Sequence, residues 1–548
     1  MKKIILILAI ILPMMAAARS QNAEFARKLQ TFNAIVKELN TNYVDTLQAT
    51  VLMDNTIDAL LSQIDPYTEY FPADNQEELQ SLTEGKYAGI GATILKRDKN
   101  VIITDPRWDT PSRNAGLRAG DVILRINGEP VTEDMDVSEV SRRLRGNAGT
   151  DIEIDVRRPY TEDSLLTFRF VRADIKVDPL PYYSVDSTGV GYIALTTFNE
   201  STARQVRSAV SEMLATPGMK GIVIDLRGNG GGLLESAVQL VGNFVPRGTE
   251  VLRTQGRSAR EQRIYKTTAA PLSTDVPLVI LTNGGTASSS EIVAGSLQDM
   301  DRAVIIGSRS FGKGLVQTAR PLPFGDLVKI TTAKYYIPSG RLIQALDYSR
   351  RNEDGSPQRM PDSLTNKFLT RAGRTVRDGG GITPDIEVSQ TETNRLMYNI
   401  VSGLWSFDYT NRYVATNPAP TDPTAPLVTD SIFADFKAFI DPARFQYDKQ
   451  CEIGIDYLRD AAKKEGYMTD SVAAAINALE ALLKHDLNHD LDLNRDKIVD
   501  ELESEIAARY FREDVLAGRE LPDDEVYQTA RAVILDPERY RTLLSAPK

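Results

Sequence analysis

The sequence predicts a multidomain protein with an α/β core, a β-rich domain before it, and helical segments at its N- and C-terminal ends. The chain has 548 residues, which is too many for one hydrophobic core. Strand-like and helix-like stretches alternate from about residue 176 to 392, as in an α/β sheet. Hydrophobic residues at 42% and charged residues at 25% are ordinary for a soluble globular protein.

The N-terminus has the pattern of a secretory signal. Lys2 and Lys3 precede an apolar stretch that ends in small residues near Ala18. An uncleaved membrane anchor is the alternative, but the stretch is short for a span and contains Pro13. We therefore expect residues 1–18 to be removed and the mature protein to be exported to the periplasm.

The two regions that follow differ in pattern. Residues 19–80 form a helical N-terminal region, in which helix is predicted over residues 24–64, because an apolar face beginning with Phe25 and Leu29 recurs at three- and four-residue spacing until DPY at 65–67 ends it. Residues 81–175 instead contain short strands separated by Gly, Pro and Asp, with one short helix at 137–146.

The α/β core is predicted over residues 176–395. Residues 221–227, GIVIDLR, and 276–282, VPLVILT, are apolar runs typical of buried strands. Residues 417–426 have the composition of a linker. Residues 427–548 show helical spacing and predict a helical C-terminal domain.

Charge and two scarce residue types narrow the function. The net charge of -11 argues against nucleic acid as the main partner. The single cysteine, Cys451, excludes an intrachain disulfide and a Cys-ligated metal site. The two histidines, His485 and His489, lie in a charged run near the C-terminus, so we do not expect a Ser-His-Asp triad.

A lysine between glycines is a candidate general base. Residues 307–314, GSRSFGKG, nearly match a phosphate-binding loop, but Gly314 offers no hydroxyl for magnesium and a strand is predicted next. Lys313 follows Phe311 and Gly312, so close packing and exclusion of water would lower its pKa. A neutral amine can take a proton from a serine, although an ordinary lysine in a surface turn is the alternative.

Three serines and a glycine run follow the two predicted buried strands. Ser288, Ser289 and Ser290 come before a predicted helix, and the glycines at 230–232 follow the other strand. Such a glycine run suits backbone N–H groups aimed at a ligand oxygen, although a flexible loop is the alternative. Neighbouring strand ends in an α/β sheet are where a site is expected.

Several motifs in order resemble a known family. IDLRGNGGG, TNGGTASSSEIVAGSLQD and FGKGLVQ are followed by AKYYIPSGRLIQ, residues 333–344, and GGITPDIEV, residues 380–388. Together they resemble the C-terminal processing (tail-specific) serine peptidases, family S41, over most of residues 176–390. The resemblance implies a crotonase-like core of ββα units and a Ser-Lys dyad whose lysine is oriented by a glutamine. It implies no metal and no nucleotide cofactor.

The resemblance also assigns site residues. Aligning the Glu-Ile pair at 291–292 places the nucleophile at Ser288, and the interval from there to Lys313 matches that of relatives. Gln317 would be the orienting glutamine, because residues at even offsets on a strand share one face.

By the same resemblance, the backbone N–H groups of Gly232 and Ser289 would form the oxyanion hole. The family's usual alanine after the nucleophile is Ser289 here. Only its backbone N–H is needed, so we expect the change to be tolerated. Ser289 and Ser290 then serve as cap and packing residues.

The β-rich domain resembles a PDZ domain through GLRAGDVILRINGEPV, residues 116–131. YAGIGA, residues 87–92, resembles its carboxylate-binding loop. Backbone N–H groups around Gly89, Ile90 and Gly91 could hold a terminal carboxylate while the peptide adds as a strand. A PDZ-like domain that only packs on the core is the alternative.

Residues 492–503 place carboxylate and amide side chains at four positions of a calcium loop, but Lys497 stands where the turn glycine is expected. We favour an amphipathic helix with Ile498, Leu502 and Ile506 on one face.

The sequence therefore predicts an exported serine endopeptidase that captures the free C-termini of polypeptides and cleaves them. A non-catalytic PDZ scaffold is the alternative. Related enzymes suggest that the helical terminal segments serve a homodimer contact or the docking of an adaptor protein.

Overall fold

A computed structural model describes residues 23–73, 76, 84–161, 164–388 and 394–546. The predicted signal, residues 1–18, lies outside these ranges. The chain divides into two compact units, one of residues 1–74 with 317–331 and the other of residues 75–316 with 332–548. Within the ranges described, the structure contains no helix with the length and apolarity needed to cross a membrane.

The smaller unit consists of helices and the tip of a β-hairpin. Residues 23–42 and α2 (Ala49–Ser62) are helical, as the apolar spacing predicted. β1 (Glu69–Phe71) pairs antiparallel with the start of β18 (Leu327–Tyr336), and β17 (Leu315–Pro321) also pairs with β18.

The β-rich domain is a sheet in the order β3-β4-β5-β7-β8, with β6 added on β5. Its strands are β3 (Ala92–Arg97), β4 (Asn100–Pro106), β5 (Val122–Ile126), β6 (Glu129–Pro130), β7 (Asp151–Arg157) and β8 (Leu165–Val171). β2 (Lys86–Gly89) pairs with β9 (Ala173–Lys176), and the helices are α4 (Pro111–Ala115) and α5 (Val137–Leu144). Alternate residues of β7, beginning at Ile152, are buried because successive side chains point to opposite faces.

The α/β core contains a six-stranded sheet in the order β10-β11-β12-β15-β16-β23. Its strands are β10 (Tyr182–Val185), β11 (Val190–Ala194), β12 (Gly221–Asp225), β15 (Leu278–Thr282), β16 (Val304–Gly307) and β23 (Ile386–Glu387). Neighbouring strands are parallel from β11 to β23, whereas β10 is antiparallel to β11. β12 and β15 are buried along their whole length, which confirms both apolar runs as buried strands.

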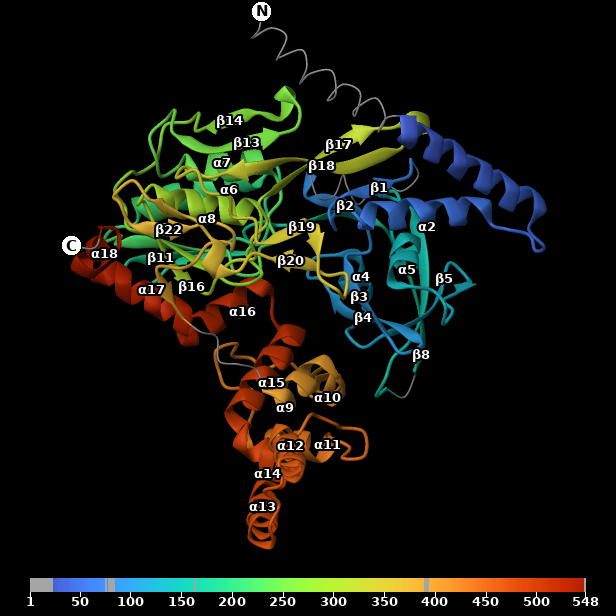
Figure 1. The fold of residues 1–548 in the computed structure, drawn as a ribbon. Helices are drawn as coiled ribbons and strands as arrows, with labels where there is room; N and C mark the ends of the chain where they lie inside the picture. The colour runs from blue at the N-terminus through green and yellow to red at the C-terminus, as the bar shows by residue number, and fades with distance from the viewer. Residues whose placement is uncertain (1–22, 74–75, 77–83, 162–163, 389–393, 547–548) are drawn as a thin grey trace, which may run out of the picture. The chain divides into compact units, whose positions relative to one another are not determined.

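Helices cover both faces of this sheet (Figure 1). Ile222 and Ile224 of β12 belong to the same core cluster as α6 (Thr202–Ala215), α7 (Leu234–Val241) and α8 (Ser289–Asp299). Val223 points the other way and packs with α17 (Glu525–Leu535) and α18 (Pro537–Leu543). The sequence placed α17 and α18 with the separate helical domain, but in the structure they complete the α/β core.

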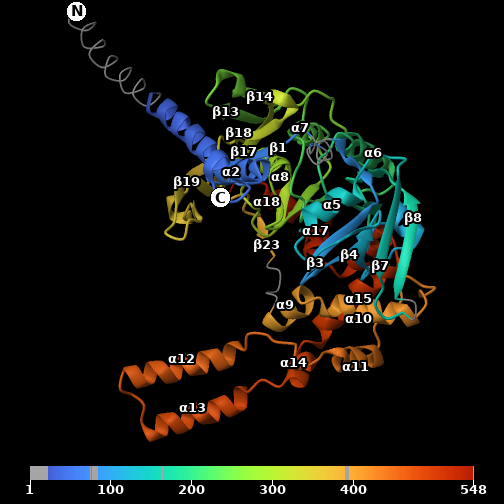
Figure 2. The ribbon, with the colours of Figure 1, turned by 90° about the vertical axis from the view of Figure 1, so that its right-hand side faces the viewer.

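The remaining helices form a core of their own. It is built from α9 (Arg395–Ser402), α10 (Trp405–Thr416), α11 (Asp430–Phe439), α14 (Leu487–Leu493) and α15 (Arg495–Tyr510), and α16 (Glu513–Glu520) follows. α12 (Gln450–Lys464) and α13 (Asp470–Leu483) form a long hairpin, seen in Figure 2, that carries an ion pair between Arg459 and Glu480. Ile498, Leu502 and Ile506 are buried on one face of α15, so the helix interpretation of residues 492–503 is confirmed.

Shorter strands border the core. The end of β18 pairs antiparallel with β13 (Glu250–Gly256), which pairs with β14 (Arg263–Lys266). Two small hairpins follow, β19 (Leu346–Arg351) with β20 (Pro357–Arg359) and β21 (Lys367–Leu369) with β22 (Thr375–Arg377).

Candidate active site

Three loops meet at one edge of the six-stranded sheet. β12, β15 and β16 are adjacent and parallel, so the segments that follow them leave from the same edge. These segments carry Gly232, Ser288 and Lys313 respectively. The fold thus brings together three of the residues that the sequence singled out.

Ser288 has a strained backbone. It lies between β15 and α8 with φ 56° and ψ -115°, although it is not glycine. Few L-residues adopt a positive φ, and such strain is concentrated at functional sites. A sharp turn from strand to helix also raises the nucleophilic serine above the sheet in the α/β-hydrolases. The geometry therefore marks Ser288 among the three consecutive serines.

The other two serines are buried and bound to the glycine loop. The Ser289 hydroxyl donates to the carbonyl of Gly232 at 2.8 Å, and the Ser290 hydroxyl donates to the carbonyl of Asn229 at 2.9 Å. Their exposed fractions are 1% and 0%, whereas Ser288 is only partly buried. Ser288 therefore offers the accessible hydroxyl of the run.

The glycine loop lies beside Ser288. Phe198 bridges this loop by donating to the Gly231 carbonyl at 3.0 Å and accepting from the Leu233 amide at 2.7 Å. The Gly232 amide takes no part in that bridge, and because its peptide bond is trans it points opposite to the Gly231 carbonyl, away from Phe198. Gly231 has φ 101°, and a Cβ built there would lie 2.9 Å from the Cβ of Ser288. Gly231 therefore lies directly against the Ser288 side chain.

Glu291 connects the serine segment to the lysine segment. Its Oε2 accepts the backbone amides of Ser288 at 2.9 Å and Lys313 at 2.8 Å. Its Oε1 accepts the Gly312 amide at 2.7 Å and the Ser310 hydroxyl at 2.5 Å. The carboxyl is fully buried; burial raises its pKa, and these hydrogen bonds act in the opposite direction.

Sequence reasoning used Glu291 only to align the motif and assigned it no role. The spacing of Ser288 and Glu291 matches the S-x-x-E pattern of a helix start, in which the glutamate binds the amide of the first residue. That pattern could have identified the contact with Ser288. It could not have identified the contacts with the lysine segment, because they depend on the tertiary fold.

Tyr335 and Gln344 also hold the lysine segment. The buried Tyr335 hydroxyl lies 2.8 Å from the Lys313 carbonyl and 3.2 Å from the Ser288 carbonyl. Gln344 Oε1 accepts the Gly314 amide at 2.7 Å. Lys313 itself is partly buried, but Phe311 is 42% exposed and is not the buried neighbour that the sequence analysis assumed.

Gln317 lies on β17, where its side-chain amide donates to the Thr331 hydroxyl at 3.0 Å. β17 begins at Leu315, so Lys313 lies before the strand, and the alternation of side chains along a strand does not place Lys313 and Gln317 on one face. The role of Gln317 as the orienting glutamine stays a prediction.

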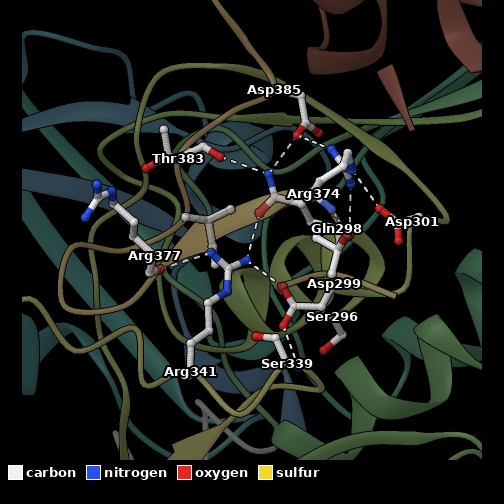
Figure 3. A network of polar contacts seen from close by, with 12 residues as sticks. Ser296, Gln298, Asp299, Asp301, Ser339, Arg341, Arg374, Arg377, Thr383 and Asp385 are labelled. Atoms are coloured by element: carbon white, nitrogen blue, oxygen red, sulfur yellow. Dashed lines mark hydrogen bonds and ion pairs between the residues drawn. The ribbon is translucent and has the colours of Figure 1, made fainter. Parts of the chain in front are cut away.

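The far end of α8 is fixed by buried ion pairs, drawn in Figure 3. Arg341 lies 2.8 Å from Asp299 and donates to Gln298 at 2.8 Å. Arg374 joins Asp301 at 2.6 Å and Asp385 at 2.5 Å. These contacts anchor the helix whose N-terminus carries Ser288.

The loop predicted to bind a carboxylate turns its carbonyls inward. The Gly91 carbonyl accepts the Thr110 and Ser112 hydroxyls, each at 3.1 Å, and the Ile90 carbonyl accepts the Ser112 amide at 2.9 Å. Within the described ranges, the amides of Ile90 and Gly91 donate to no protein acceptor. Gly89 differs, because it lies in β2 opposite Ala173. β3, which follows the loop, is the edge strand of its sheet.

Metal-binding side chains do not gather in the described part of the chain, where no group of three or more His, Cys, Asp or Glu is placed to hold an ion.

Models of known protein families match successive regions of the chain. The model of peptidase family S41 matches residues 189–348, and a PDZ-domain model matches residues 102–158. A third model, described as the C-terminal helical domain of a probable PDZ-protease, matches residues 396–534. These matches follow the order of domains that the sequence predicted.

The similarity of this chain to known proteins identifies its family. A carboxy-terminal-processing protease of Bartonella bacilliformis is 36% identical over 323 residues, which cover 58% of this chain and 73% of that protein. A probable CtpA-like serine protease of Staphylococcus haemolyticus is 32% identical over 68% of this chain and 73% of its own. A solved photosystem II D1 C-terminal processing protease is 27% identical over 65% of this chain and 86% of its own, with a TM-score of 0.37. The chain belongs to the carboxy-terminal processing proteases of peptidase family S41.

Proposed function

We propose that this protein is an endopeptidase that uses Ser288 as nucleophile and Lys313 as general base. The observation that carries this proposal is the position of Glu291, whose Oε2 binds the backbone of both residues. In a Ser-Lys dyad the lysine must lie within hydrogen-bond reach of the serine hydroxyl before its basicity can matter. The backbones that carry the two side chains must therefore be held at a fixed distance. Neither histidine competes for this role, because both belong to the helical domain, where His485 pairs with Asp490 and His489 lies in α14.

The reaction follows from these positions. Neutral Lys313 takes the proton of Ser288, whose oxygen attacks the scissile carbonyl and forms a tetrahedral intermediate. The amides of Gly232 and Ser289 stabilise the negative oxygen, and each such donor contributes roughly 10²–10³-fold to kcat in serine proteases. Lys313 then protonates the leaving amine, and water hydrolyses the acyl-enzyme.

The PDZ domain captures the substrate in this proposal. The Ile90 and Gly91 amides receive the terminal carboxylate, and the substrate tail adds to the edge strand β3 beside α5. An unstructured tail of any sequence can add to β3 in this way, since the hydrogen bonds are made by its main chain and do not depend on its side chains. Polypeptides with free C-termini are therefore the proposed substrates.

Residues 1–18 support a location outside the cytoplasm, where the substrates would be the tails of exported proteins. Fractionation of cells that produce the full chain, with N-terminal sequencing of the mature protein, tests this. Recovery of the intact N-terminus in the cytoplasm would overturn it.

The dyad is tested with an unstructured peptide whose products are identified by mass. We expect Ser288→Ala, Lys313→Ala and Lys313→Arg to lose cleavage, because arginine keeps the charge of lysine but cannot serve as a base. Ser290→Ala is the matched control within the serine run and should retain activity. Cleavage by Ser288→Ala at the wild-type rate would refute the assignment.

A second peptide that ends in an amide in place of a carboxylate tests capture. It should bind and be cleaved more weakly than the free acid. If the wild-type protein binds the free acid but cleaves neither peptide, the scaffold alternative is correct.

A further inference from the structure

A cavity of about 460 Å³ lies between the PDZ domain and the helical domain, within the larger unit. The PDZ side contributes the turn after α4 and the residues after β7. The helical side contributes the ends of α10 and α15 and the start of the linker. Its volume lies in the range of small-molecule sites.

The wall of the cavity is strongly basic. Arg113, Arg118, Arg158 and Arg509 line it, and the described residues around it include no Asp or Glu. The whole chain has a net charge of -11, so this positive surface runs against the protein's overall charge.

Two of these arginines are neutralised by partners behind the wall. Arg158 binds Asp121 through two contacts of 2.8 Å, and Arg509 binds Glu505 at 2.9 Å. Their positive charge is therefore largely balanced within the protein.

The other two arginines make no ion pair with any described residue. Arg113 donates to the Arg509 carbonyl at 2.8 Å and lies 3.8 Å above the Trp108 ring. The exposed Arg118 side chain makes no hydrogen bond within the described part of the chain. Burial lowers the pKa of Arg113, and the positive charges of Arg509 and Arg118 lower it further, while Asp105 raises it.

We propose that this cavity binds a small organic dianion, a dicarboxylate or a phosphate monoester, whose charged oxygens pair with Arg113 and Arg118. Guanidinium groups match the geometry of both anions through paired N–H donors. Leu117, Val414 and Pro418 line the same space and would contact the carbon skeleton of the ligand. The bound dianion would touch both domains and strengthen their contact, which the described residues otherwise make through pairs such as Arg97 with Asp408 at 2.7 Å.

Thermal unfolding and titration calorimetry of the full mature protein test this proposal at constant ionic strength. The probes are succinate, glycerol phosphate and the monoanion acetate. We expect at least one dianion to raise the unfolding midpoint with saturation, as a ligand of the native state does, and acetate not to. The dianion that binds more tightly shows whether the cavity accepts a dicarboxylate or a phosphate monoester.

Arg118→Ala should weaken this binding by at least about tenfold, since it removes a charge-assisted contact. Arg125→Ala, on an exposed PDZ arginine outside the cavity, is the matched control and should bind as the wild type does. Arg113→Ala is the second variant and should also bind weakly. The proposal is overturned if neither dianion shows saturable binding at millimolar concentration, or if folded Arg118→Ala binds as tightly as wild type.

Discussion

The backbone amides of Ser288 and Lys313 donate to the same carboxylate oxygen of Glu291, at 2.9 and 2.8 Å. The two residues are separated by a helix and a strand in the sequence, but one atom fixes the distance between their backbones. Tyr335 repeats this arrangement on the carbonyl side of both residues. The proposed dyad is therefore held from two sides by buried groups.

Glu291→Gln should lower kcat/KM by about 10²-fold, because displacement of catalytic groups by about 1 Å costs that much. A glutamine would place an NH₂ group against backbone N–H donors at one of the two oxygen positions. The rate of peptide cleavage measures this effect. Glu235→Gln, in the exposed first turn of α7, is the control and should cleave normally. Normal activity in Glu291→Gln would contradict the bridging role.

The stability of the protein should reveal which effect sets the pKa of Glu291. Burial raises this pKa above the ordinary value of 4.5, so the folded state binds the proton more tightly than the unfolded state. The contribution of Glu291 to stability is then full below pH 4.5 and is lost as the pH rises through the raised pKa. Denaturant unfolding of wild type and Glu291→Gln across this range measures the difference. A cost of the substitution that grows with pH would show that the hydrogen bonds outweigh burial.

Ser289→Ala should lower kcat roughly tenfold and leave KM unchanged, a smaller loss than removal of an oxyanion-hole donor. The Ser289 hydroxyl holds the Gly232 carbonyl, so without it the backbone of Gly232, including its own amide, becomes freer to move. Ser290→Ala should instead keep its kcat. Ser290→Ala leaves the buried Asn229 carbonyl without its donor and should lose about 1–3 kcal/mol of stability. Ser289→Ala should lose less stability, because Gly232 is exposed and water can bind its carbonyl. An equal effect of the two substitutions on kcat would contradict a positioning role for the Ser289 side chain.

Removal of residues 522–548 should make the protein insoluble, because it uncovers the sheet face that contains Val223 and Val279. Replacement of residues 450–483 by a short Gly-Ser linker should leave a folded protein. Within α12 and α13 that hairpin buries only Ile455 and Ile476. The ends of the hairpin lie close together in the native protein, where the His485 backbone amide donates to the Glu452 carboxylate, so a short linker can join them. Soluble yield and far-UV circular dichroism distinguish the two deletions.

The sequence was sufficient for features that depend on local pattern. The runs at 221–225 and 278–282 are buried strands because β-branched and apolar side chains alternate to two covered faces. The place of Ser288 followed from a motif, and the structure adds the strained backbone and the burial of its two neighbours.

The sequence was not sufficient for features that depend on partners distant in the chain. An amphipathic helix such as α17 shows an apolar face without showing what covers it, so its place on the core sheet was missed. The same holds for Arg227, which joins Asp225 at the end of β12 to Asp524 at the start of α17, each at 2.5 Å. Such contacts combine residues whose spacing carries no periodic signal.

The packing of the C-terminal helices α17 and α18 on the sheet affects how the protein folds during its synthesis. The Tyr540 hydroxyl accepts the Leu278 amide at 2.9 Å across 262 residues of chain. During translation, the strands of the core emerge from the ribosome long before the helices that shelter one of their faces. Contacts of such high sequence separation form slowly, and the uncovered strands remain prone to aggregation until then. The α/β core, which carries Ser288, therefore cannot finish folding until the C-terminal helices have been synthesised.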